Sequence, residues 1–114
     1  MIRFENISKV YQSKNSIIEA VSNVTIHVKE REIYGIIGFS GAGKSTLLRI
    51  GNLLEKPSVG KIYMNQQPLT TLSKKELREA RHKIGMIFQS FNLVSNKTVW
   101  DNVRFLCPLP QSLF

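Results

Sequence analysis

Nine consecutive residues in the first half of the chain have the types and spacing needed to bind a phosphate. The stretch GFSGAGKST, residues 38–46, fits G-x-x-x-x-G-K-[ST]. Glycines let the backbone approach an anion, a lysine supplies positive charge to the β- and γ-phosphates, and a hydroxyl can bind Mg²⁺. We therefore predict a nucleotide-phosphate site and call residues 38–46 the phosphate loop. Its predicted ligand-binding residues are Gly38, Phe39, Ser40, Gly41, Ala42, Gly43, Lys44, Ser45 and Thr46, with Lys44 also catalytic and Ser45 a metal ligand.

The segments on either side of the phosphate loop favour the same interpretation. Residues 33–38 are short and nearly all apolar, which predicts a strand buried on both faces of a parallel sheet. Leucine and isoleucine then recur at helical spacing from Gly43 to Glu55, and Pro57 ends the pattern. A strand-to-helix loop presents the free amides and the positive dipole end of the helix to an anion. The alternative is a glycine-rich turn that binds nothing, but chance gives this pattern in only about 0.4% of chains of this length.

The remaining segments predict a mixture of short strands and helices. Strands are expected over residues 2–8, 24–28, 61–64 and 84–88. Ser73 with Glu76 three places later predicts the start of one helix, and Thr98 with Asp101 predicts another, which Pro108 must end. Alternating strands and helices indicate an α/β fold.

Composition narrows the class of protein. The chain has 114 residues, is 42% hydrophobic, and lacks the run of about 20 apolar residues that a membrane span needs. Its single cysteine, Cys107, and the absence of a signal-peptide pattern predict a cytoplasmic protein. A formal charge of +8 favours acidic partners. The basic run over residues 74–83 has no interleaved aromatic residues for base stacking, so we expect a solvated helix face and no nucleic-acid partner.

Beyond the phosphate loop, much of the chain resembles one family. The stretches MIRFENISKVYQ, IYGIIGFSGAGKSTLLRIGNLLEKPSVGKI and LREARHKIGMIFQSFNLVSNKTVWDNV resemble, in order and spacing, the ATP-binding subunits of ABC transporters, most closely the methionine importer branch. The resemblance implies a P-loop NTPase fold of the ABC ATPase type with an antiparallel β portion. It covers residues 1–103, expected to be part of a nucleotide-binding domain, and leaves residues 104–114 as a divergent tail.

The resemblance also implies a cofactor, further site residues and partners. ATP and Mg²⁺ would be bound, Tyr11 would be the aromatic platform for adenine, and Gln89 would contact Mg²⁺ and the attacking water in a catalytic role. The loop of Phe91, Asn92 and Leu93 would face a membrane permease, and a second ATPase subunit would complete a homodimer on the inner face of the cell membrane. From the residues alone, the alternatives are a half-buried strand tyrosine for Tyr11 and a solvated strand end for Gln89.

The family's later motifs have no counterpart in this sequence. The LSGGQ signature, an apolar strand ending in Asp-Glu and a switch histidine are not found, and His27 and His82 lie in other segments. We therefore expect a truncated, N-terminal part of the ATPase that binds ATP and does not hydrolyse it alone. Two alternatives are the ATPase of a polar-amino-acid importer and a free-standing basic module that binds nucleotides or nucleic acid.

Overall fold

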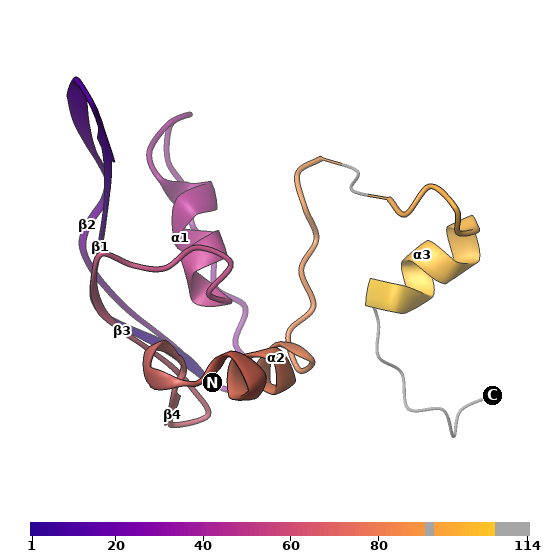
Figure 1. The fold of residues 1–114 in the computed structure, drawn as a ribbon. Coiled ribbons are helices and arrows are strands. Elements are labelled where there is room, and N and C mark those ends of the chain that lie inside the picture. Colours follow the sequence, from indigo (N-terminus) through magenta and orange to yellow (C-terminus); the bar gives the residue numbers. More distant parts are fainter. Residues whose placement is uncertain (91–92, 107–114) are drawn as a thin grey trace. The chain divides into compact units, whose positions relative to one another are not determined.

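The computed structural model describes residues 1–90 and 93–106 (Figure 1). The chain divides into two compact units, Met1–Arg78 and the residues after it, and each is described by itself. The elements are β1 (Ile2–Ser13), β2 (Ser16–Val28), α1 (Lys44–Gly51), β3 (Val59–Met64), β4 (Gln67–Pro68), the 3-10 turn η1 (Leu69–Thr71), α2 (Lys74–Arg81) and α3 (Val99–Leu106).

The first unit contains a four-stranded sheet in the order β2-β1-β3-β4, and every pair of neighbours is antiparallel. The strands predicted over residues 2–8, 24–28 and 61–64 are confirmed, and each is longer than predicted. Asn65 and Gln66 join β3 to β4 with φ of 47° and 69°. Two consecutive left-handed residues make the tight hairpin turn that suits twisted strands, although neither residue is glycine.

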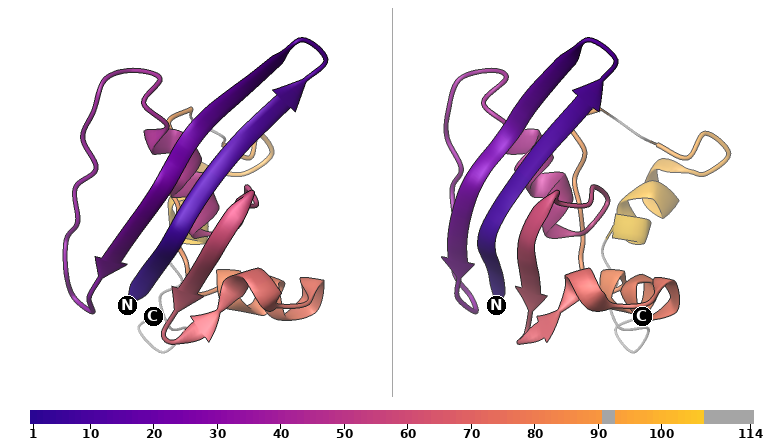
Figure 2. Two further views of the ribbon diagram at one scale, coloured as in Figure 1. Left: turned by 90° about the vertical axis from the view of Figure 1, so that its left-hand side faces the viewer. Right: turned by 60° about the vertical axis from the view of Figure 1, so that its left-hand side comes forward.

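Helix α1 packs against one face of this sheet (Figure 2). Phe4, Ile7 and Ile62 from the sheet are buried together with Leu47 and Ile50 from α1. Gly51 allows the close approach, because a Cβ at this position would lie 3.0 Å from the Phe4 ring. This core fixes α1, and therefore the loop that leads into α1, against the sheet.

The end of α1 differs from the prediction. Sequence periodicity extended the helix to Glu55, but it ends at Gly51 with Asn52 as its cap. Leu53 has a φ of 54°, and its amide donates to the carbonyl oxygen of Ile50 at 2.9 Å. A left-handed residue cannot continue a right-handed helix, so the chain turns here although Leu53 stays buried.

Two predicted strands are not formed. Residues 33–38 and 84–88 form neither helix nor strand, and in the described part of the chain no strand pairs with them. Ile33 is fully exposed and Ile37 is 96% exposed. An apolar run becomes a buried parallel strand only when other strands flank it and helices cover it, and the described sheet is entirely antiparallel.

Both predicted helix starts are confirmed by their side chains. At α2 the Ser73 amide donates to the Glu76 carboxylate at 2.9 Å, and the Glu76 amide donates back to the Ser73 hydroxyl at 3.3 Å. At α3 the Asp101 amide donates to the Thr98 hydroxyl at 3.1 Å. Each arrangement satisfies amides that a helix start leaves free. Pro108 lies outside the described residues.

None of the described helices combines the length and the apolar character required to cross a bilayer.

Candidate functional site

The phosphate loop follows residues 32–37, which form neither helix nor strand, and leads into the first turn of α1. Gly41 and Gly43 have φ of 81° and 80°, a left-handed conformation that glycine adopts without steric cost. Gly43 is the N-cap residue of α1, and its carbonyl accepts the first helical bond from the Leu47 amide at 2.8 Å. Because Gly43 has no side chain, it caps none of the amides of the first turn, so they remain available to an external acceptor.

The Lys44 ammonium lies against the loop's own backbone. Its Nζ donates to the carbonyl oxygens of Gly38 and Phe39, at 2.7 Å in both cases. An ammonium carries three protons, so these two bonds leave one for a further acceptor. The same loop thus contains an ammonium and leads into the free amides of α1, which together are the combination an oxyanion requires.

Backbone contact joins the phosphate loop to β2. A Cβ added to Gly43 would collide with the carbonyl oxygen of Ala20. On the other strand of this hairpin, Val10 pairs with Glu19 and Tyr11 pairs with Ile18. The register therefore brings Tyr11 to the part of the hairpin that holds the start of α1. Sequence reasoning missed Ala20, because nothing in its type or spacing marks a backbone contact.

Tyr11 is 40% exposed, so part of its side chain is open to a ligand. The Lys9 ammonium lies over its ring, 4.9 Å from the centroid. Lys9 was not predicted as a site residue, and its position two residues before Tyr11 is the only hint in the sequence.

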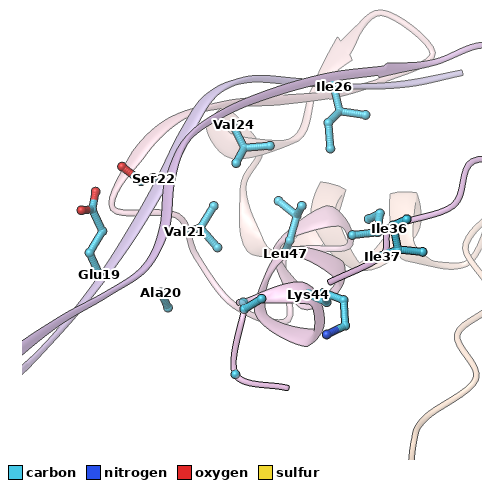
Figure 3. A pocket seen from close by; sticks show the side chains of 13 residues that line it. Glu19, Ala20, Val21, Ser22, Val24, Ile26, Ile36, Ile37, Lys44 and Leu47 are labelled. Carbon is cyan, nitrogen blue, oxygen red and sulfur yellow. The ribbon is translucent and has the colours of Figure 1, made fainter. Parts of the chain in front are cut away.

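A cavity of about 470 Å³ lies between β2 and α1, with the phosphate loop at one end (Figure 3). Val21 and Val24 of β2 project toward Leu47 of α1, so most of this wall is apolar. The backbone and the ammonium of residues 41–44 form the other end. Only that end has the chemistry to bind a phosphate, and the apolar remainder is a packing surface.

The other predicted residues of the loop lie on one continuous stretch. Ser45 is exposed and Thr46 half-buried in the first turn of α1, while Ser40, Gly41 and Ala42 are exposed. Phe39 is 93% exposed. Tyr11 thus belongs to the β1–β2 hairpin, and the phosphate loop contacts the same hairpin through Gly43.

Gln89 and the phosphate loop belong to different units of the chain. Gln89 is an exposed residue of the second unit, and the segment before it forms no strand. Its predicted place at the end of a buried strand is therefore wrong. Ser45, predicted to bind Mg²⁺ together with Gln89, belongs to the first unit. Among the residues described, no group of three or more His, Cys, Asp or Glu side chains could hold a metal ion.

The loop predicted to face a permease is only partly described. Phe91 and Asn92 lie outside the described residues, and Leu93 is 64% exposed.

Comparisons with known proteins all find similarity to ATP-binding proteins of ABC transporters. A family model described as "ABC transporter" matches residues 21–112. Methionine import ATP-binding protein MetN 1 of Bacillus anthracis is 56% identical over 103 residues, which are 90% of this chain and 30% of that protein. MetN 2 of the same species is 55% identical over 105 residues, 92% of this chain and 31% of that protein. The chain therefore spans less than a third of these curated relatives.

Solved structures of an ABC transporter cassette have a similar fold. A dimeric structure of MJ0796, a bacterial ABC transporter cassette, matches with a TM-score of 0.86 and 40% identity over 92% of this chain and 46% of that one. A dimeric post-hydrolysis state of MJ0796 bound to ADP and Pi gives a TM-score of 0.84 and 40% identity over 90% of this chain and 45% of that one.

Proposed function

Because this chain belongs to the ABC transporter family, we propose that its phosphate loop binds ATP with Mg²⁺. The observation that carries the proposal is the pairing of uncapped amides in the first turn of α1 with the ammonium of Lys44. Helix-start amides and a neighbouring cation together favour a polyphosphate over a neutral ligand. A related cassette binds ADP and Pi, which supports the same class of ligand here.

Each part of the nucleotide has a proposed partner. Lys44 would bind the β- and γ-phosphates, and Tyr11 would stack on the adenine through its exposed surface. The exposed hydroxyl of Ser45 is an oxygen ligand of the kind that Mg²⁺ accepts, and Gln89 would provide a second oxygen. Mg²⁺, when bound, would neutralise part of the phosphate charge.

For the longer protein that its relatives represent, we propose the ATP-binding subunit of a methionine importer. The names of the similar proteins support methionine, and the dimeric cassettes support work as a pair. Residues 1–103 would be part of the nucleotide-binding domain and residues 104–114 a divergent tail. The loop of residues 91–93 would contact a membrane permease, with the ATPase on the cytoplasmic face of the membrane.

The phosphate site is tested by substituting its cation in the full chain. Lys44→Ala removes a charge-assisted contact, so the affinity for Mg²⁺-ATP should fall at least about tenfold in a fluorescent-nucleotide titration. Lys61→Ala is the matched control, because it removes the same charge from an exposed position on β3 and should leave the affinity nearly unchanged. Equal affinities of the wild type and Lys44→Ala would refute the phosphate site.

A further inference from the structure

Lys9 links the ring of Tyr11 to the segment that follows α1. Its Nζ lies 4.9 Å from the centroid of the Tyr11 ring. The same ammonium pairs with the carboxylate of Glu55 and donates to the carbonyl oxygen of Lys56 at 2.8 Å. The side chain of Lys9 is only 13% exposed, and that of Glu55 is 30% exposed. One lysine thus contacts three groups from two parts of the fold.

These contacts fix the position of the ammonium. A charge withdrawn from water is costly unless it is paired, and here a carboxylate, a carbonyl oxygen and a ring face replace the water. Because three partners converge on Nζ, the lysine has little freedom to leave the ring. One face of Tyr11 is therefore covered by a held cation, while 40% of the residue stays exposed.

The β1–β2 hairpin is consequently tied to α1 at both ends of the helix. Gly43, the N-cap of α1, meets the backbone of Ala20 on β2. Glu55 and Lys56, which follow the helix, meet Lys9 on β1. A ligand that occupies both the phosphate loop and Tyr11 requires a fixed spacing between them, and these two connections set that spacing.

We propose that Lys9 is a positioning residue for nucleotide binding: it holds the Tyr11 ring so that one face is closed by the ammonium and the other is presented to the base. The proposal rests on the proposed role of Tyr11 as the adenine platform. It adds to that role the reason why the ring adopts one orientation, and it assigns Glu55 as the anchor of the lysine.

The test compares ligands with and without a base. Lys9→Met keeps most of the apolar stem of the side chain and removes its charge, so the Tyr11 ring should lose its fixed orientation and ATP affinity should fall about threefold. Tripolyphosphate, which has no base, should bind equally to the wild type and the variant. Lys9→Arg keeps the cation over the ring and should retain the affinity for ATP, and Lys61→Met controls for the loss of one positive charge.

A double-mutant cycle with Tyr11→Ala tests whether Lys9→Met lowers ATP affinity through Tyr11. Once Tyr11 is alanine, Lys9→Met should cause no further loss of ATP affinity. Glu55→Gln should reproduce the Tyr11-dependent loss, and it keeps the test decisive if Lys9→Met does not fold. Circular dichroism of each variant establishes that it is folded before its affinity is compared.

The outcomes separate this inference from the proposed function. Unchanged ATP affinity in folded Lys9→Met or Glu55→Gln, or an equal loss for tripolyphosphate, would overturn the positioning role while the phosphate site stands. If Lys44→Ala weakens ATP binding and Tyr11→Ala does not, Tyr11 does not bind the adenine. The proposed role of Lys9 is then refuted as well. If Lys44→Ala has no effect, the proposed function itself is wrong.

Discussion

Replacing Gly43 with alanine tests whether the phosphate loop is held against β2. The added methyl meets two obstacles, a φ of 80° and the carbonyl oxygen of Ala20. A left-handed conformation costs a residue with a Cβ about 1–2 kcal/mol. The carbonyl belongs to a strand that is paired with β1 and cannot easily move, so overpacking adds about 1–3 kcal/mol. The free energy of unfolding should therefore fall by about 2–5 kcal/mol.

Two other glycines separate these contributions. Gly41 has a φ of 81°, but an added Cβ meets no atom within 4 Å, so Gly41→Ala should cost only the conformational part. Gly35 has neither obstacle, and Gly35→Ala should leave stability unchanged or raise it slightly. Urea unfolding of the full chain, followed by circular dichroism, should rank the variants in this order. If Gly43→Ala were no more destabilising than Gly41→Ala, the inferred contact with β2 would be wrong.

Two further predictions concern local structure. Gln66 has a φ of 69°, so Gln66→Gly should relieve about 1 kcal/mol of strain and raise the melting temperature, whereas a lower melting temperature would contradict a left-handed turn. A hydrogen bond from the Ser73 hydroxyl, and a weaker contribution from the Ser73 amide, lower the pKa of Glu76 below its ordinary value. A lowered folded-state pKa stabilises the fold above the unfolded value, and this contribution disappears as the pH falls through the folded value. An NMR titration should give Glu76 a lower midpoint in the wild type than in Ser73→Ala, and equal midpoints would exclude the Ser73 bonds as the cause.

The sequence predicted the features that depend on neighbouring residues. Ser73 with Glu76 and Thr98 with Asp101 form hydrogen bonds across three residues, so the sequence pattern contains both partners. The phosphate loop is likewise a continuous motif with its own helix start. The alternation of apolar residues on β2 reflects burial on one face, and its strand was found for that reason.

The features that the sequence did not predict correctly depend on partners that are distant in the sequence. An apolar run over residues 33–38 shows a preference for burial but does not show which strand would pair with it, and in the described structure none does. Periodicity could not locate the end of α1, because Leu53 is both apolar and left-handed. The contact of Lys9 with Glu55 joins two widely separated parts of the sequence, and no local pattern identifies it.

The position of β1 in the middle of the sheet has a consequence for the order in which the chain can assemble. β1 pairs on one side with β2, its immediate successor, and on the other with β3, which follows a connection over residues 29–58 that contains the phosphate loop and α1. The hairpin needs only a short-range closure, whereas the second pairing must close this longer connection at a higher entropic cost. At the far end of the connection, the Ser58 amide donates to the carbonyl oxygen of Ser8 on β1 at 2.8 Å. We therefore expect the phosphate loop to be enclosed at the same step as the non-local half of the sheet, at a rate set by the slower pairing of β1.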